Sequence, residues 1–459
     1  MAGLRARVVG VWKRVLDLAW PIMAEQTFRT AMRTTDIVVT GFFSPAAIAA
    51  IGLADLYARL PLRIGLGLGG GAIALSSQDT GADAVANRDE AVSQALLFGA
   101  LAGVPFAVFG WLFGERAIAV LGAPGNVAAM GGLYLAVILA TAPARHVALV
   151  GARSLQGTGD TRTPMYVNVA SNGLNIVGSV VLGLGVGPVP RYEVLGVGAA
   201  TAFGNVFTAV VIVAAMVFDR TEASLVRPVD PTVGRQLAVV SAPRIAEGMV
   251  ATVVEFPFNS VLLAFGTEVN AAYQVGRRMY QQVTGPLSRG YNVAASVVVG
   301  QALGRGDADG ARFEGWAVVA LGLLTVGAVG VVLFAFAPRF VLVFTRDDTT
   351  VPVAVGFART YAVAAPFLVA FVVLSGALQG GSDTRTPFLA RTSGLVGFFL
   401  GFSYLAGVVL GYGVVGVYAG IALYYVWATA VAGYGFRFGS WAGRAAEMMD
   451  ARGTAPGED

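Results

Sequence analysis

Long apolar stretches recur along the whole chain, and twelve of them are long enough to cross about 30 Å of hydrocarbon. They lie at 15–41, 46–76, 91–113, 127–150, 164–186, 194–218, 237–264, 269–301, 314–337, 351–375, 387–411 and 413–436. Charged residues make up 13% of the chain, against about 25% in a typical soluble domain. The sequence therefore predicts an all-α integral membrane protein with twelve transmembrane helices.

The second half of the sequence repeats the first. The segment SLQGTGDTRTP at 154–164 returns as ALQGGSDTRTP at 377–387, an offset of 223 residues. Each half holds six spans, an even number, so both halves should cross the membrane in the same direction. The predicted domains are a six-helix lobe at 1–218, a cytoplasmic linker at 219–236 and a six-helix lobe at 237–459. A cleft between such lobes is the expected place for a substrate.

The distribution of basic residues predicts that both termini are cytoplasmic. In that orientation the inner segments hold sixteen Arg and Lys residues and the outer segments hold four, as the positive-inside rule requires. The chain has no cysteine and one histidine, His146. This composition excludes disulfides and thiolate metal sites and leaves almost no room for a histidine-based triad. A membrane-embedded enzyme is therefore the weakest functional alternative.

Each copy of the repeated element predicts a tight turn between two helices. In the first copy, Gly157 should end one helix in a left-handed cap, and Asp160 should accept backbone amides of the turn. Thr163 should cap the next helix, with Pro164 at its first position. The corresponding residues of the second copy are Gly380, Asp383, Thr386 and Pro387. The full spacing of a phosphate-binding loop is absent.

At this element the chain resembles the multidrug and toxic compound extrusion (MATE) transporters. Further segments carry the resemblance: LAWPIMAEQ at 18–26, TDIVVTGFFSPAAIAAIGLA at 35–54, VVGQALGRGDADGA at 298–311 and GVVGVYAGIAL at 413–423. The resemblance implies two six-helix lobes in a V, alternating access, and antiport of organic compounds against H⁺ or Na⁺ as the coupling ion.

The expected partners are small organic, often cationic, substrates and the lipid bilayer. We expect no nucleic acid and no cofactor, and a monomer that crosses the plasma membrane many times. The alternative within the same wider superfamily is a flippase for a lipid-linked or glycan head group. Such a flippase would need a large and strongly cationic cleft.

The first span carries four charged residues on one helical stripe. Glu25, Arg29, Arg33 and Asp36 are spaced by four, four and three residues. One interpretation is a structural ladder of two ion pairs, Glu25–Arg29 and Arg33–Asp36. The other is that Asp36 is a titratable switch, because burial disfavours the charged form of a carboxylate. Asp36 also matches the acidic residue of this span in the family.

The resemblance implies further members of a cation-coupling site in the first lobe. Tyr134 resembles the tyrosine of the fourth span, and Asn175 matches the asparagine of the fifth. Many family members have an aspartate where this chain has Ser179, so a Na⁺ site at Asp36 and Asn175 would lack one formal charge. Asn172, Asn175 and Ser179 fall on one helical face. The alternative is that these side chains hold helices together.

The second lobe offers secondary coupling candidates. Glu247, Glu255 and Asn259 follow one another in the seventh span at spacings of eight and four. Glu25 is a further candidate, and its match to Glu247 in the repeat favours a shared structural role.

Three further features remain open in the sequence. His146, beside Arg145, is either part of a proton relay or a histidine satisfied by helix contacts. Arg277 in the eighth span is expected to pair with a carboxylate or to line the cleft. The polar end of the chain, 444–459, is expected to be frayed.

Overall fold

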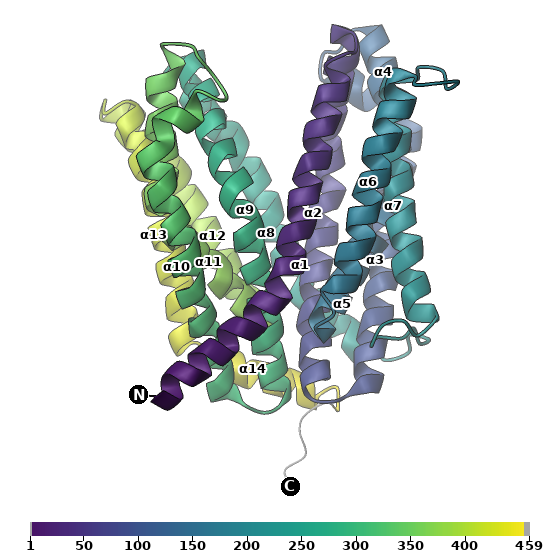
Figure 1. Ribbon diagram of the computed structural model, residues 1–459, viewed down its shortest axis with the longest axis vertical. Coiled ribbons are helices and arrows are strands. Elements are labelled where there is room, and N and C mark those ends of the chain that lie inside the picture. The colour runs from purple at the N-terminus through teal and green to yellow at the C-terminus, as the bar shows by residue number, and fades with distance from the viewer. Residues whose placement is uncertain (1, 454–459) are drawn as a thin grey trace. The chain divides into compact units, whose positions relative to one another are not determined.

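The computed structural model describes residues 2–453, and all regular secondary structure in that range is helical (Figure 1). The first half holds α1 (Ala2–Thr40), α2 (Pro45–Gly81), α3 (Val85–Val120), α4 (Gly125–Ala140), α5 (Ala142–Thr158), α6 (Arg162–Leu184) and α7 (Glu193–Val217). The second half holds α8 (Pro231–Leu263), α9 (Thr267–Gly304), α10 (Ala308–Val341), α11 (Thr350–Gly380), α12 (Arg385–Gly394), α13 (Val414–Phe438) and α14 (Trp441–Asp450). Two π-helical segments, Leu395–Phe402 and Leu405–Val409, continue α12. The predicted all-α fold class is confirmed.

Within residues 2–453, nine helices are long and apolar enough to cross a membrane: α2, α3, α6, α7, α8, α10, α11, α12 with its π-helical continuation, and α13. The pair α4 and α5, bent by 44° at its break, makes a tenth. Helices α1 and α9 are 39 and 38 residues long, but charged side chains interrupt their apolar stretches. Each of the twelve predicted spans coincides with one of these helices or helix pairs.

The chain packs into two compact units. Unit 1 contains α1 up to Met23, the segment Ser77–Asp83 and the chain from Ala246 onward. Unit 2 contains Ala24–Ser76 and Ala84–Ile245. Helices α1, α2 and α8 therefore contribute to both units, whereas the predicted lobes follow the sequence repeat. Those lobe boundaries stay a prediction.

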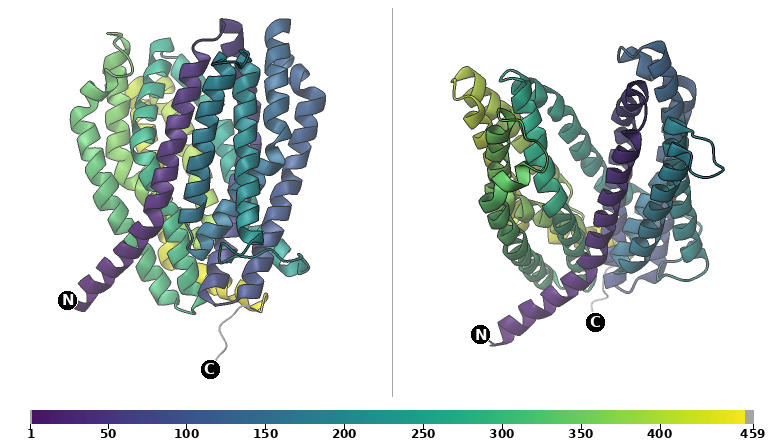
Figure 2. Two further views of the ribbon diagram at one scale, coloured as in Figure 1. Left: turned by 45° about the vertical axis from the view of Figure 1, so that its right-hand side comes forward. Right: turned by 45° about the horizontal axis from the view of Figure 1, so that its top comes forward.

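The first half of α1 belongs to unit 1 because it packs on α10. The indole N–H of Trp12 donates to the carbonyl oxygen of Ala317 at 2.8 Å. The guanidinium of Arg7 lies 4.1 Å from the centre of the Phe313 ring, a cation–π contact. Figure 2 shows this part of α1, in purple, running across the green helices of unit 1.

The repeated element uses its first glycine for close packing. A Cβ on Gly157 would crowd the carbonyl oxygen of Ile73, and a Cβ on Gly380 would overlap that of Ser296. Ile73 and Ser296 are themselves 223 residues apart, so both halves repeat the same contact. The predicted left-handed caps at Gly157 and Gly380 are wrong, because Gly159 and Ser382 take the positive φ instead, at 104° and 58°.

The aspartate of each copy makes the predicted contacts. The Oδ1 of Asp160 accepts the N–H of Thr163 at 2.9 Å, and the Oδ1 of Asp383 accepts that of Thr386 at 3.1 Å. Thr163 and Pro164 lie inside the first turn of α6 instead of at its cap and first position. The side chain that caps the helix is therefore the aspartate, and the tight turn between helices is confirmed.

The linker between the halves is fixed to the start of α3. Helix α8 begins at Pro231, inside the predicted linker. The carboxylate of Glu90 accepts the N–H groups of Val229 at 2.6 Å and Asp230 at 2.8 Å. The hydroxyl of Ser93 accepts the N–H of Val226 at 2.9 Å. These contacts satisfy backbone groups that an extended segment leaves without helical partners.

The end of the chain was predicted to be frayed over 444–459, and for its described part this is wrong. Helix α14 packs on α9 and brings the buried Trp441 ring to stack on Phe436, with ring planes 9° apart. The guanidinium of Arg444 lies 2.7 Å from the carboxylate of Asp383 in the repeated element. Residues 454–459 lie outside the described residues.

Candidate functional site

A polar cluster inside unit 2 joins α1, α6 and α7. The hydroxyl of Ser179 lies 2.8 Å from the Asp36 carboxylate and 3.4 Å from the side-chain oxygen of Asn175. The amide nitrogen of Asn175 donates to the hydroxyl of Thr201 at 3.1 Å. Asn175 and Ser179 are buried and Asp36 is half-buried. The structure thus brings three predicted residues together and adds Thr201, which the sequence did not indicate.

The geometry gives the cluster two complete hydrogen-bond patterns. A serine hydroxyl has one hydrogen and two acceptor lone pairs. When Asp36 is charged, Ser179 donates to it across the shorter distance of 2.8 Å. When Asp36 is protonated, its O–H can donate to Ser179, and Ser179 can turn its own hydrogen to Asn175. Both states keep the Asp36–Ser179 contact, so a proton can be taken up without breaking the cluster.

The charges near Asp36 come from α1 and α2. Those that act on its carboxylate belong to Asp55 and Arg33. The predicted ion pair between Arg33 and Asp36 is wrong, since no ion pair between them occurs among the described residues; Asp36 bonds to α6 instead. Tyr134 is buried on α4, where the charges of Asp36 and Asp55 act on it. Tyr134 therefore lies within electrostatic reach of the cluster.

Asn172 stands apart from the cluster. It is half-buried one turn before Asn175 on α6. Its side-chain nitrogen has no hydrogen-bond partner within residues 2–453. Its predicted role stays a prediction.

Glu25 and Glu247, which the repeat relates, both form ion pairs with arginine. Glu25 pairs with Arg29 one turn along α1 at 2.8 Å, as predicted. Glu247 on α8 pairs with Arg391 on α12 at 2.8 Å. Their side chains are 6% and 3% exposed, so each pairing offsets the cost of burying a carboxylate. These contacts favour a structural role, while a coupling role for either residue stays a prediction.

The other two candidates of the seventh span, Glu255 and Asn259, also have hydrogen-bonding partners within unit 1. Glu255 pairs with Arg277 on α9 at 2.6 Å, the kind of pairing predicted for that arginine. Asn259 donates to the backbone oxygen of Glu255 at 2.7 Å, and its own oxygen faces the Gln274 amide at 3.4 Å. Both side chains of the Glu255–Arg277 pair remain partly exposed, at 33% and 24%.

A metal cluster is not found in the described part of the chain, where no three His, Asp or Glu residues gather at one place. A Na⁺ ion at the cluster would find oxygens from Asp36, Ser179 and Asn175 but only one formal charge. The Ser179 hydrogen, which points to Asp36, would have to turn away.

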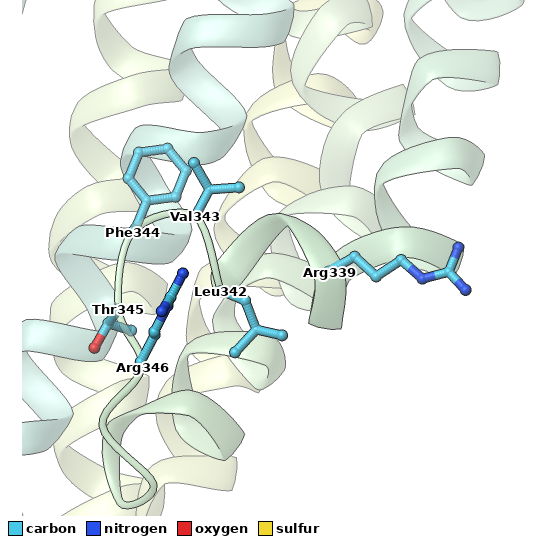
Figure 3. A pocket seen from close by; sticks show the side chains of 6 residues that line it. All are labelled: Arg339, Leu342, Val343, Phe344, Thr345 and Arg346. Atoms are coloured by element: carbon cyan, nitrogen blue, oxygen red, sulfur yellow. The ribbon is translucent and has the colours of Figure 1, made fainter.

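A pocket of about 580 Å³ lies away from these residues, at the end of α10. It is lined by Arg339, Leu342, Val343, Phe344, Thr345 and Arg346. Figure 3 shows the guanidinium of Arg339 pointing away from Arg346, so the two charges do not converge on one point. No predicted site residue lines this pocket.

Comparison with known proteins shows which family the chain belongs to. A family model described as MatE matches residues 21–181 and 243–423. The chain belongs to the MatE family. The two matched stretches begin at Pro21 and Pro243, which lie 222 residues apart, within one residue of the offset of the internal repeat. A MatE protein is a multi-pass membrane transporter, and the predicted resemblance is confirmed.

Curated relatives match most of the chain. It is 30% identical over 419 residues to the "Probable multidrug resistance protein NorM" of Rhodopseudomonas palustris, covering 89% of this chain and 88% of that protein. It is 25% identical over 394 residues to the protein of the same name from Thermotoga maritima, covering 84% and 83%.

Solved structures share the fold. One is a MATE transporter in a bent conformation, with a TM-score of 0.86, 21% identity and 99% of each chain covered. Another is an outward-facing multidrug resistance MATE transporter of the MOP superfamily, with a TM-score of 0.84 and 22% identity. It covers 95% of this chain and 96% of that one. At this identity the likeness extends to the fold alone.

Proposed function

We propose that this MatE protein is a secondary active exporter that exchanges small organic compounds, often cationic, for H⁺. It works as a monomer in the plasma membrane, with both termini in the cytoplasm, and carries out transport without catalysis or a bound cofactor. The names of its relatives, which are multidrug resistance proteins, support the substrate class. The excess of basic residues in the inner segments supports the orientation.

The hydrogen-bonded contact between Asp36 and Ser179 carries the proposal. It connects α1 to α6 within unit 2, so a change in the charge of Asp36 acts on the packing of two helices. An ion can drive transport only if it binds one conformation more tightly than another. The hydrogen bond from Ser179 stabilises the charged form of Asp36, so a conformation that separates α1 from α6 would bind the proton more tightly, and this is the difference in affinity that coupling requires.

The chemistry of the cluster favours H⁺ over Na⁺. Asp36 supplies one carboxylate, and Ser179 stands where many family members have a second. Within the described residues, the side chains hydrogen-bonded in this cluster are neutral apart from Asp36, and no hydrogen bond joins the cluster to Asp55, the second carboxylate whose charge acts on Asp36. A proton needs one carboxylate and one hydrogen-bond partner, which are present at 2.8 Å.

The test is efflux of a fluorescent organic cation from proteoliposomes that contain the purified protein. We expect an inward-directed H⁺ gradient to drive export. A Na⁺ gradient at equal pH on both sides should leave export at the level of protein-free vesicles. Export driven only by Na⁺ would overturn the choice of ion. Export that needs neither gradient would overturn the antiport itself. Export that requires an added lipid precursor would overturn it as well.

A further inference from the structure

We propose that His146 is a second proton-binding site of this transporter, which carries an imidazolium in the conformation seen here. The inference rests on the proposed exchange for H⁺ and adds a site that is separate from Asp36. His146 is the single histidine of the chain, lies on α5 and is fully buried.

The two ring nitrogens of His146 both face acceptors. Nε2 lies 2.7 Å from the carbonyl oxygen of Pro61 on α2, and Nδ1 lies 3.1 Å from that of Gly99 on α3. A backbone carbonyl can only accept a hydrogen bond. A neutral imidazole has one N–H and one lone pair, so one of the two contacts would place a lone pair against an oxygen. Only the imidazolium donates to both.

The surroundings fix the ring in this position. A Cβ on Gly65 of α2 would overlap the imidazole, so this glycine makes room for it. From α3, the ring of Phe106 meets the imidazole edge-on at 6.3 Å between centroids. A ring held by three helices cannot turn one nitrogen away from its carbonyl without a change in packing.

Two effects oppose the charge. Burial disfavours the imidazolium, and the neighbouring Arg145 is the one titratable group among the described residues whose charge acts on the ring. The proton is therefore held only while both carbonyls reach the nitrogens. If one carbonyl withdraws, the neutral tautomer with a single N–H becomes the better match, and the proton leaves for water.

Helix α2 can bend at Pro61, the residue whose carbonyl oxygen faces Nε2. Pro61 lies inside α2 and has no N–H, so one helical hydrogen bond is missing and the helix can bend there. A change in that bend would withdraw the Pro61 oxygen from Nε2 while the Gly99 contact on α3 stays. The neutral ring would then donate from Nδ1 to Gly99, and proton binding at His146 would be linked to the shape of α2.

The single histidine makes a direct test possible. The full chain, purified with a histidine-free tag and labelled with ¹⁵N-histidine, gives the ring signals of a single imidazole, Nδ1 and Nε2, in lipid nanodiscs. We expect both nitrogens to be protonated at about pH 5, with loss of one proton as the pH rises to about 8. A single neutral tautomer throughout the range from about pH 5 to 8 would overturn the proposal.

Proton release on substrate binding tests whether His146 takes part in transport. With a pH-indicator dye and a fluorescent organic cation, we expect His146→Gln and Asp36→Asn each to lose part of the release, and the double variant to lose all of it. Phe113→Leu, which removes an exposed aromatic ring of α3 but no titratable group, should release as many protons as the wild type. Complete loss in Asp36→Asn alone would contradict a second site. No release from the wild type, with the imidazolium present by NMR, would instead refute the H⁺ exchange proposed above.

Discussion

The hydroxyl of Ser179 lies 2.8 Å from the carboxylate of Asp36, although the two residues are 143 positions apart in the chain. This contact joins the charged stripe of α1 to the polar face of α6. It places a serine at the position where many MATE proteins have a second acidic residue. The choice of coupling ion should therefore depend on this pair.

Ser179→Asp should make export respond to a Na⁺ gradient. The variant places a second carboxylate beside Asp36 and the Asn175 oxygen, and hard cations prefer charged oxygen ligands. Efflux from proteoliposomes under a Na⁺ gradient at equal pH measures the gain. The matched control is Ser179→Asn, which adds an oxygen without a charge and should stay insensitive to Na⁺. Equal responses of the two variants would contradict the role assigned to this position.

Arg391→Met should destabilise the protein because it leaves the Glu247 carboxylate buried without its arginine. Breaking a buried pair costs about 3 kcal/mol, and since Arg391 is 39% exposed we expect roughly 2 kcal/mol. Thermal unfolding in detergent should show a lower Tm. The double variant Arg391→Met with Glu247→Leu should recover most of the loss. A double variant less stable than the single variant would show that another contact of Glu247 contributes more to stability than its pair with Arg391.

Arg452→Ala should cost more stability than Arg444→Ala. The guanidinium of Arg452 lies 2.8 Å from Asp79, and both side chains are fully buried. Loss of such a pair costs about 3 kcal/mol or more. Arg444 also binds a buried aspartate, Asp383, but is itself 46% exposed, so its loss should cost about as much as that of Arg391, roughly 2 kcal/mol. Similar melting temperatures for the two variants would show that burial of the C-terminal pair adds nothing.

The cap that Asp347 forms at the start of α11 should persist in acid. The hydroxyl of Thr349 and the N–H of Thr350 donate to Asp347 at 2.6 and 2.7 Å, and these bonds lower the pKa of Asp347 from 3.8 to about 2. Because the folded pKa is the lower one, the stabilisation is complete above the ordinary pKa and is lost as the pH falls through about 2.

Amide exchange measures this cap. At about pH 3 the amides of Thr349 and Thr350 should still be protected in the wild type. Asp347→Ala should speed their exchange at neutral pH, whereas Asp348→Ala, at the neighbouring position, should not. Equal exchange in both variants would contradict the capping role.

The sequence predicted the fold well because length and hydrophobicity determine where a helix can cross a membrane. All twelve predicted spans coincide with helices, including α1 and α9, whose charged residues weaken the signal. The repeat also predicted equivalent packing, and the contacts of Gly157 and Gly380 repeat it. The sequence missed α14, because a short amphipathic helix in a polar tail has no apolar run to mark it.

The site could be predicted only within single helices. Helical spacing placed Asn175 and Ser179 on one face, but no local pattern says which helix that face meets. For the same reason Arg33 seemed a partner for Asp36 within α1, whereas Asp36 bonds to α6. Thr201 was missed because one threonine in an apolar span gives no signal of its own. The linker contacts of Glu90 were missed because they are made to backbone amides, which every sequence supplies.

The central claim is that Asp36 couples the proton to export, and one measurement tests it most directly. Asp36→Asn keeps the shape of the side chain but cannot carry the negative charge. In proteoliposomes under an imposed pH gradient, we expect it to bind the organic cation yet export none of it, while Ser179→Asn retains gradient-driven export. Export by Asp36→Asn at the wild-type rate would contradict the account and move the coupling site to other carboxylates, with Glu255 the first to examine.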